Sequence, residues 1–237
     1  MPSRETNKKP RVAVFDIDGT IFRSSLLIEV TDALIIKGVF PKSVSRTYAR
    51  AKENWLNRRA DYDRYILAVI RAFDTHIRGV HYKVFKKIAR EVVDTHEDRV
   101  YRYTRDLVKS LKRKKYFLLA ISHSPKDIVD EFARRLGFDK VYGRLIEMNS
   151  NGTFTGKTLL SDLILNKAKV VQRAVLKERL TLAGSVGVGD TESDIPLLTM
   201  VERPICFNPN GKLYRYAKRR GWKIIVERKD VIYEMNS

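Results

Sequence analysis

Short, continuous runs of Val, Ile, Leu and Phe recur along the chain, and they restrict its fold more than any other feature. A continuous apolar run, unlike an alternating one, is typical of a strand that is covered on both faces of a parallel sheet. Helical patterns separate most of these runs, so the sequence predicts an α/β protein with a doubly wound, Rossmann-like parallel sheet. The expected strands are residues 11–17, 116–122, 185–190, 204–208 and 223–227.

One long interval departs from this alternation. From about residue 24 to residue 115 only helical patterns follow one another, so we expect an all-helical subdomain inserted just after the first strand. We therefore assign residues 1–22 and 106–237 to the sheet domain and residues 23–105 to an inserted helical domain. A later segment, residues 145–157, contains Asn151-Gly152, which predicts a β-hairpin beside the sheet.

One helical pattern between the strands has clear end signals. In the segment SPKDIVDEFARRLG, we expect Ser124 to be the N-cap and Pro125 to occupy the first helical position. Gly137 is expected to stop the helix, because glycine readily adopts the left-handed conformation that ends many helices.

Composition limits the class of protein. With 237 residues, 43% of them hydrophobic, the chain can bury one sizeable core and a smaller second one. No window approaches the roughly 18 consecutive apolar residues of a membrane span, and residues 1–11 lack the apolar segment of a secretory signal. The single cysteine, Cys206, cannot form an internal disulfide and fits a buried structural thiol. We expect a cytoplasmic protein.

The formal net charge of +19 raises the local concentration of nucleic acid, anionic lipid surfaces or phosphorylated substrates around the protein. The excess of cations is spread along the chain. Its densest run, residues 112–115, ends a predicted helix, where the helix dipole favours cations. No nucleic-acid-binding signature accompanies this charge, so nucleic acid is not the expected partner.

Two carboxylates follow the first predicted strand. Positions i and i+2 of an extended chain point the same way, so Asp16 and Asp18 can face one cleft beyond the strand end, where parallel sheets bind ligands. Gly19 permits the turn after them, and Thr20 offers a hydroxyl and a backbone amide. The alternative is an ordinary Asx turn in which Asp18 caps the next segment of the chain.

Further polar residues follow other strands: Ser122 ends the second, and Asp190 and Asp194 follow the third. The spacing of the two aspartates places them one turn apart at a predicted helix start, where capping alone would explain them. With Asp16 and Asp18, however, they supply up to four acidic groups at neighbouring strand ends. Such a cluster in a cleft needs a hard cation such as Mg²⁺.

Lys167 lies on the apolar side of a predicted helix. Its neighbours one turn away are apolar, whereas those of Lys169 are mostly polar. A lysine on the packed face needs an anionic partner, unless its flexible stem carries the ammonium group to the surface. The apolar neighbours are Leu163, Ile164, Val170 and Val171.

These motifs, in this order, resemble the four signature motifs of the haloacid dehalogenase superfamily of phosphohydrolases. They are DIDGT, a serine after the second core strand, a lysine on a later helix, and GDTESD. The helical insertion just after the first motif is similar to the cap of the phosphoserine-phosphatase-like branch, and the 23-residue step from Lys167 to Asp190 also fits that branch. The resemblance covers about residues 11–227.

The resemblance implies a role for each motif residue. Asp16 would be the nucleophile that forms an aspartyl phosphate, and Asp18 the acid and base. Ser122 and Lys167 would bind phosphoryl oxygens. Asp190 would bind Mg²⁺ together with Asp16 and the backbone carbonyl of Asp18. To the same site we assign Asp194, which would support the metal, and Gly19, Thr20 and His123, which would help to bind substrate.

The expected function is hydrolysis of a phosphomonoester. Two alternatives stay open: transfer of the phosphoryl group to another alcohol, and a basic protein that only grips nucleic-acid phosphates. Phosphoserine phosphatases of this branch carry a glutamate at the position of Ser25, and the nearest acid here, Glu29 one turn later, is expected to replace it at most partly. His123 stands where their glycine follows the serine, and it either lines the pocket or packs at the strand end. We expect a small phosphorylated metabolite or a phospholipid-like monoester as substrate.

Overall fold

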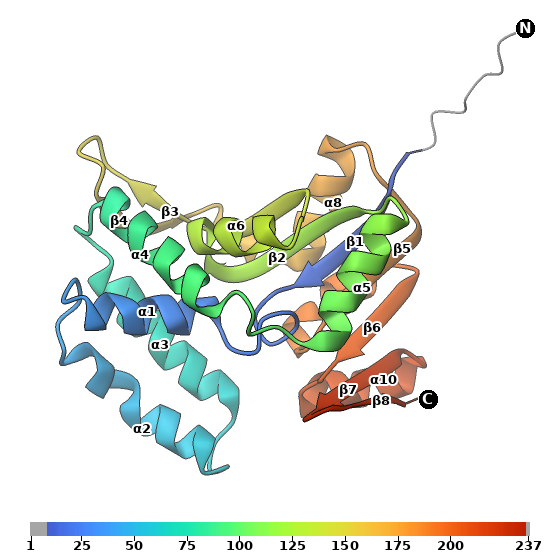
Figure 1. Cartoon of the computed structure of the whole chain (residues 1–237), viewed down its shortest axis with the longest axis horizontal. Coiled ribbons are helices and arrows are strands. Elements are labelled where there is room, and N and C mark those ends of the chain that lie inside the picture. The colour runs from blue at the N-terminus through green and yellow to red at the C-terminus, as the bar shows by residue number, and fades with distance from the viewer. Residues whose placement is uncertain (1–8, 236–237) are drawn as a thin grey trace, which may run out of the picture.

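The chain forms an eight-stranded sheet with helices on both faces in a computed structural model, which describes residues 9–235 (Figure 1). The strand order is β4-β3-β2-β1-β5-β6-β7-β8. The six strands from β3 to β7 in this order are parallel, and the edge strands β4 and β8 are antiparallel to their neighbours. The strands are β1 (Arg11–Asp16), β2 (Phe117–Pro125), β3 (Lys140–Met148), β4 (Phe154–Leu159), β5 (Thr181–Gly189), β6 (Arg203–Phe207), β7 (Lys223–Arg228) and β8 (Val231–Met235).

Alternate residues of the central strand β1 enter two different hydrophobic clusters. Val12 and Val14 pack with the helices of one face, and Ala13 and Phe15 pack with those of the other. This burial on both faces explains why the sequence of the strand is continuously apolar. The prediction of a doubly wound parallel sheet is therefore confirmed.

Helices cover the sheet on both sides. The first face carries α5 (Arg102–Arg113) and α6 (Lys126–Arg135), whose apolar residues join the cluster of Ala13 and Phe15. The second face carries α8 (Lys167–Lys177), α9 (Ile195–Leu198) and α10 (Gly211–Arg220), and the short helix α7 (Ser161–Ile164) precedes α8.

Four further helices form a lobe beside the sheet and share one hydrophobic cluster with its first face: α1 (Leu26–Ile36), α2 (Val44–Leu56), α3 (Tyr62–His76) and α4 (Tyr82–His96) (Figure 1). The chain leaves and re-enters the sheet domain at one place. There the backbone amide of Arg23 donates to the carbonyl of Arg99, and that of Tyr101 donates to Ile21. The predicted boundary at residue 105 falls within α5, which packs against β2.

The predicted hairpin at Asn151-Gly152 is present as β3 and β4 and also contacts the helical lobe. The amide of Gly79 donates to Phe154, and the amide of Phe154 donates to Val80. The amide of Tyr82 donates to Gly152. The hairpin thus attaches to the loop between α3 and α4 through backbone hydrogen bonds, in addition to the two chain connections.

Two details differ from the sequence expectations. Ser124 is not the N-cap of α6: β2 continues through Pro125, and the Ser124 hydroxyl donates to Asp18 instead. The edge strand β8 was not predicted. Gly137 does end the helix, with a backbone φ of +80°, and Cys206 is buried.

Among residues 9–235, no helix has the length and apolar character needed to cross a membrane. The expectation that no secretory signal is present rests in part on residues 1–8. These residues lie outside the described part of the chain.

Candidate active site

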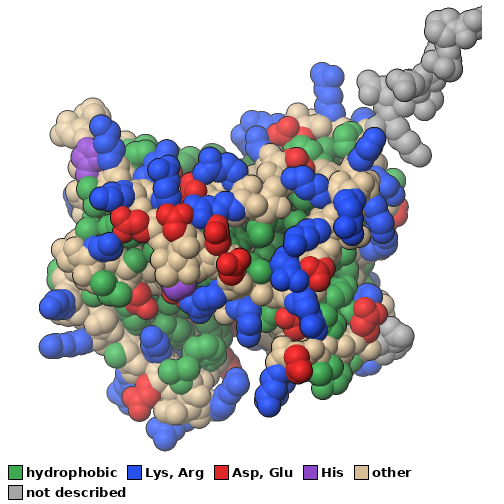
Figure 2. Space-filling view, viewed as in Figure 1, with side chains coloured by type: hydrophobic (Ala, Val, Ile, Leu, Met, Phe, Trp, Pro, Cys, Tyr) green, Lys and Arg blue, Asp and Glu red, His purple; other side chains and the backbone are tan. Residues whose placement is uncertain are grey.

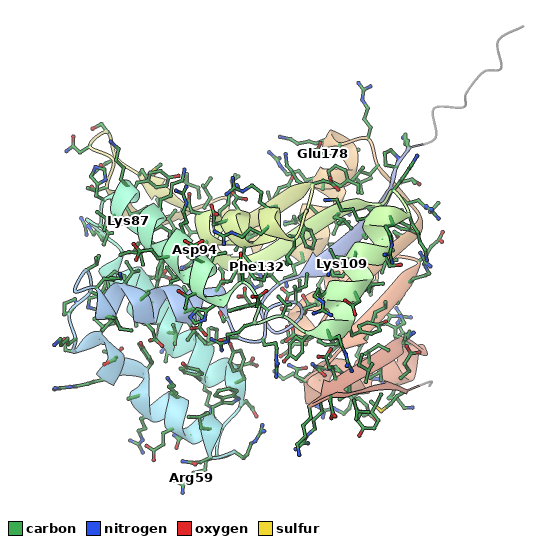
Figure 3. All side chains as sticks on the ribbon, viewed as in Figure 1. Arg59, Lys87, Asp94, Lys109, Phe132 and Glu178 are labelled. Atoms are coloured by element: carbon green, nitrogen blue, oxygen red, sulfur yellow. The ribbon has the colours of Figure 1, made fainter. Side chains whose placement is uncertain are left out.

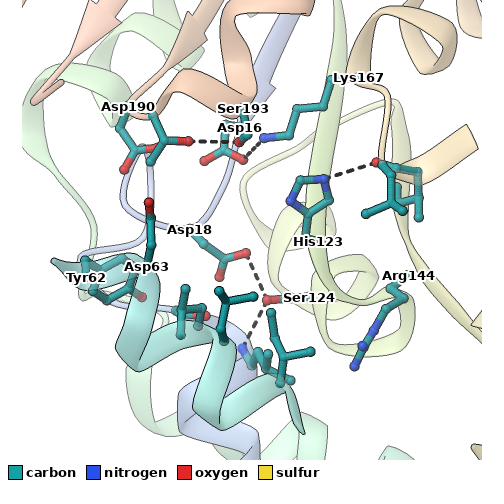
Figure 4. Close-up of a pocket in the computed structure, with 18 of the residues that line it drawn as sticks. Asp16, Asp18, Tyr62, Asp63, His123, Ser124, Arg144, Lys167, Asp190 and Ser193 are labelled. Carbon is teal, nitrogen blue, oxygen red and sulfur yellow. Dashed lines mark hydrogen bonds and ion pairs between the residues drawn. The ribbon is translucent and has the colours of Figure 1, made fainter. Parts of the chain in front are cut away.

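A cavity of about 470 Å³ lies beyond the carboxyl ends of β1, β2 and β5, between these strand ends and helices α1 and α3 (Figure 4). It contains the residues that the sequence singled out after separate strands: Asp16, Asp18, His123, Lys167 and Asp190 all line it. Ligands of parallel sheets bind at this edge, so the cavity is the candidate active site.

Both carboxylate oxygens of Asp18 accept hydrogen bonds. Oδ1 accepts from the backbone amide of Leu26 at 2.6 Å, and Oδ2 accepts from the hydroxyls of Ser122 at 2.5 Å and Ser124 at 2.9 Å. Burial raises the pKa of Asp18 above its usual value, while these hydrogen bonds oppose the shift. A raised pKa brings the protonated form of this carboxyl group closer to neutral pH, as a general acid requires.

Lys167 is buried, with 2% exposure, and forms an ion pair with two carboxylates. Its Nζ lies 2.6 Å from Oδ1 of Asp16 and 2.5 Å from Oδ1 of Asp194. Burial alone would lower the pKa of Lys167, but the two carboxylates outweigh burial and raise it, so the side chain is positively charged. The expectation that Lys167 has an anionic partner on the packed face is confirmed.

Asp194 holds several groups in place. Its Oδ2 accepts from the backbone amides of Asp190 and Thr191, both at 3.0 Å. The segment Glu192–Asp194 forms a short 3₁₀ turn, which Asp194 and Thr191 cap reciprocally. The capping alternative considered for the GDTESD motif is therefore partly right. The same carboxylate also fixes Lys167.

Asp190 lies close against the turn that follows β1. The hydroxyl of Thr20 donates to its Oδ1 at 3.2 Å. Gly19 has a backbone φ of +84°, and a Cβ atom there would lie 2.2 Å from Oδ2 of Asp190. Only glycine both adopts this conformation and leaves room for the carboxylate.

The acidic cluster has the properties of a cation site. Carboxylate oxygens of Asp16, Asp190 and Asp194 lie within 4.8 Å of one another. Burial and the neighbouring carboxylates raise the pKa values of Asp16 and Asp190. Oδ2 of Asp16 is buried without a hydrogen-bond partner in the described structure. A hard cation would relieve this repulsion, and carboxylate oxygens are the ligands that it prefers, so the donor set fits Mg²⁺.

Not every predicted ligand-binding group faces the cavity. Ser122 is fully buried, donates to Asp18 and does not line the cavity, whereas Ser124 does. Thr20 is also fully buried, with its hydroxyl directed to Asp190. Their role in binding phosphate stays a prediction. Because Ser124 was interpreted as a helix cap, the sequence analysis did not predict that it lines the cavity. Its position two residues from Ser122 on the same strand could have indicated this.

His123 lines the cavity, which decides between the two placements considered from the sequence. Its Nε2 lies 3.1 Å from the carbonyl oxygen of Ile164. Burial and the nearby charge of Lys167 lower the pKa of His123 to about 4, so the imidazole is neutral near pH 7.

Sequence reasoning missed most of the cavity wall. Tyr62 on α3 lines the cavity, and so does Arg144 on β3, which was the lone cation within an apolar stretch of its strand. The apolar part of the wall comes from α1, α3 and the segment around α7: Leu27, Ile66, Leu67, Ile70, Ile164 and Leu165.

The two residues considered for an amine site lie in different places. Ser25 lines the cavity and is 2% exposed. Glu29 does not line it. Instead its carboxylate pairs with Arg99 at 3.2 Å and lies 3.4 Å from His96. The structure therefore does not bring Glu29 into the position of the missing glutamate.

A second cleft of about 720 Å³ adjoins the cavity and shares Tyr62, Asp63, Asp190 and Thr191 with it. Figure 2 shows the surface hollowed between the helical lobe and the sheet domain, with Lys and Arg side chains on both sides. Four cations line this outer cleft: Arg58 and Arg59 from the loop between α2 and α3, and Lys212 and Arg215 from α10.

The sequence model of the haloacid dehalogenase-like hydrolases matches residues 13–199. A putative hydrolase of Mycobacterium leprae is 27% identical over 217 residues, which cover 90% of this chain and 71% of that protein. Phosphoserine phosphatase SerB1 of Mycobacterium tuberculosis is 26% identical, and the match covers 90% of this chain and 69% of that protein.

Solved structures show the same fold. A protein of unknown function from Bordetella pertussis matches with a TM-score of 0.74 at 20% identity, covering 92% of this chain and 98% of that one. A phosphoserine phosphatase, solved as an analogue of its phospho-aspartyl intermediate, matches with a TM-score of 0.60 at 18% identity, covering 94% and 96%. With its ordered motifs and inserted helices, the chain belongs to the haloacid dehalogenase-like hydrolase family, in its phosphoserine-phosphatase-like branch.

Proposed function

We propose that this hydrolase is a Mg²⁺-dependent phosphatase that cleaves a phosphomonoester through an aspartyl-phosphate intermediate. The arrangement of Asp16 supports this proposal most directly. One of its oxygens is held by Lys167, and the other has no hydrogen-bond partner in the described structure. A carboxylate held in this way is oriented and has one oxygen left for attack on phosphorus.

In the first half of the reaction, Oδ2 of Asp16 forms a bond to phosphorus while the bond from phosphorus to the leaving oxygen breaks. Asp18, in its protonated form, gives its proton to that oxygen, and the alcohol leaves. In the second half, Asp18 takes a proton from water as the water oxygen attacks phosphorus. Cleavage of the aspartyl bond releases inorganic phosphate and restores the Asp16 carboxylate.

Asp16, Asp190 and the backbone carbonyl of Asp18 would hold Mg²⁺, with Asp194 supporting Asp190 through its backbone amide. When bound, Mg²⁺ offsets the repulsion between the nucleophile and the negatively charged phosphoryl group. Lys167 adds a fixed positive charge beside Asp16, and we assign it to a phosphoryl oxygen as well.

The substrate is a small phosphorylated metabolite or a phospholipid-like monoester, acted on in the cytoplasm. L-Phosphoserine is not the preferred substrate, because Ser25 replaces the amine-binding glutamate and Glu29 is engaged with Arg99. Apolar side chains of α1 and α3, such as Leu27 and Ile66, contribute to the cavity wall instead. An advantage of more than tenfold in kcat/KM for L-phosphoserine over glycerol phosphates, sugar phosphates and nucleotides would overturn this substrate assignment.

The decisive experiment compares the wild type with Asp16→Asn under rapid quench. The wild type should form an acid-stable phospho-enzyme with p-nitrophenyl phosphate, and Asp16→Asn should form none and lose at least about four orders of magnitude in turnover. Excess chelator should abolish turnover and Mg²⁺ should restore it, whereas Ca²⁺ should not, because its larger coordination shell positions the reacting groups poorly. Phospho-enzyme in Asp16→Asn, or full turnover in chelator, would contradict the proposal.

A further inference from the structure

Arg144 carries hydrogen-bond donors that nothing in the described structure uses. Its side chain is only 11% exposed. Nη1 pairs with the carboxylate of Asp74, at 2.8 Å from Oδ1 and 3.0 Å from Oδ2. Nε and Nη2 are buried and have no hydrogen-bond partner among residues 9–235. A buried donor without a partner costs free energy, so two of them on one guanidinium call for an explanation.

The ion pair with Asp74 explains only part of this arrangement. It joins β3 of the sheet domain to α3 of the helical lobe, and it would need only one nitrogen of the guanidinium. The ring of Phe73, whose centroid lies 5.3 Å from Cζ of Arg144, supports the flat group from one side. Asp74 and Phe73 thus fix the orientation of the guanidinium and leave the Nε–Nη2 edge without an acceptor.

Arg144 lines the same cavity as the catalytic aspartates. Figure 4 shows His123 between Lys167 and Arg144, so Arg144 lies on the side of His123 that faces away from the Asp16–Lys167 pair. His123 is neutral near pH 7 and cannot neutralise an anion placed there. The wall around these residues is apolar, with Ile66 and Ile70 on α3 and Ile164 at the end of α7.

We propose that the Nε–Nη2 edge of Arg144 binds a second oxyanion of the substrate, separated from the phosphoryl group by an apolar carbon body. The inference rests on the proposed phosphatase function and names the substrate class. A guanidinium presents two parallel donors to a carboxylate or a phosphate, and such charge-assisted pairs are strong where water is excluded. No amine is required, because Asp74, the acid beside Arg144, is already paired with it.

The test is a matched series of substrates. Each ω-carboxyalkyl phosphate is compared with the unsubstituted alkyl phosphate of the same length, over spacers of two to six methylene groups, and α,ω-alkane bisphosphates form a parallel series. At the best spacer, the oxyanion should raise kcat/KM by about tenfold to a hundredfold, as expected for hydrogen bonds to a charged group. Comparison of the two series tells a carboxylate ligand from a phosphate ligand.

Two variants locate the effect. Arg144→Gln should reduce the preference for the oxyanion to less than about threefold, and Arg144→Lys should keep only part of it, because an ammonium group lacks the bidentate edge. Arg215→Gln is the matched control, since it removes an exposed arginine from the outer cleft and should retain the preference. Melting temperatures of all three variants show whether they are folded.

A binding measurement removes the dependence on turnover. In the Asp16→Asn background, calorimetry should show tighter binding of the carboxyalkyl phosphate than of the alkyl phosphate, and Arg144→Gln should abolish the difference. Turnover of alkyl phosphates without any preference for the oxyanion, or loss of the preference in Arg215→Gln, would refute the role of Arg144 and leave the phosphatase function intact. Failure to hydrolyse any phosphomonoester would refute the phosphatase function itself.

Discussion

The inner cavity and the outer cleft share several lining residues but differ in the side chains that make up the rest of their walls. The inner cavity has apolar side chains in its wall, and the acid and lysine groups at its base, such as Asp16, Asp18 and Lys167, are buried or nearly so and held by hydrogen bonds or ion pairs. The outer cleft is lined by charged side chains of both signs, among them the exposed cations Arg58 and Arg215 and the exposed acid Asp61. The loop that carries Arg59 projects from the helical lobe in Figure 3, with its side chain extended into solvent.

The difference indicates a division of tasks. Buried, oriented groups act strongly on a bound molecule, because water does not screen them. Exposed cations instead attract anions from a distance, and salt weakens this attraction. We therefore expect the inner cavity to determine chemistry and selectivity, and the outer cleft to determine how fast an anionic substrate arrives.

The largest expected difference between the two regions is the effect on turnover of replacing an aspartate in each of them. Asp18→Asn should lower steady-state turnover of alkyl phosphates by about two to four orders of magnitude, because the leaving alcohol loses its proton donor. With p-nitrophenyl phosphate, whose phenolate leaves without a proton, a small burst should remain before turnover stops. Rapid-quench kinetics at saturating Mg²⁺, with folding confirmed by circular dichroism, measure both phases.

Asp63→Asn is the control for Asp18→Asn, because Asp63 lies where the two regions meet and its side chain is 46% exposed. It should change turnover by less than about threefold, as is usual for an exposed ion pair. If Asp63→Asn were as damaging as Asp18→Asn, or if Asp18→Asn affected aryl and alkyl esters equally, the proposed division would be wrong.

A smaller effect is expected for His123 in the inner cavity. Its pKa is about 4 in the folded protein and about 6.5 in the unfolded chain, so the unfolded chain binds more protons between these values. Stability should therefore fall as the pH is lowered from about 6.5 to about 4, and His123→Gln should lack this contribution. Relative to the wild type, the variant should gain about 1–3 kcal/mol in unfolding free energy on acidification from pH 7.5 to pH 4.5.

Urea unfolding of both proteins at the two pH values measures this gain. The comparison between proteins cancels the titration of all other groups. If the difference in unfolding free energy between His123→Gln and the wild type were the same at pH 7.5 and pH 4.5, the pKa of His123 would not be lowered by folding.

The smallest effect belongs to the outer cleft. Arg58→Glu combined with Arg215→Glu should lower kcat/KM about threefold to tenfold at low ionic strength and leave kcat unchanged, because only the arrival of substrate is affected. The effect should largely disappear at about 0.5 M salt. Lys109→Glu, an equal charge change per site on the exposed face of α5, should have little effect (Figure 3). A loss that persists at high salt would mean that these arginines contact the substrate directly.

The sequence predicted those features that depend on local pattern. The continuous apolar run of β1 predicted a strand buried on both faces, and the apolar neighbours of Lys167 predicted its burial and its anionic partners. Asp16 and Asp18 were predicted to face one cleft from their spacing alone, and both line the cavity.

The missed features depend on how distant elements pack. Arg144 is one cation among many in the sequence, and only the pairing of β3 with β2 and the approach of α3 bring it to the cavity. Ser124 has a favourable capping sequence, but the extension of β2 through Pro125 turns its hydroxyl toward Asp18 instead. Tertiary contacts can override local preferences in this way.

The hydrogen bonds between the β3–β4 hairpin and the loop that joins α3 and α4 affect how parts of this protein can be exchanged. A helical lobe grafted from a relative would have to present backbone groups that match those of Gly79, Val80 and Tyr82, or the donors and acceptors along residues 152–154 would lose their partners. For anyone building chimeras, the four helices and the turn around residues 152–154 therefore have to be exchanged together, although α5, β2 and α6 lie between them in the sequence.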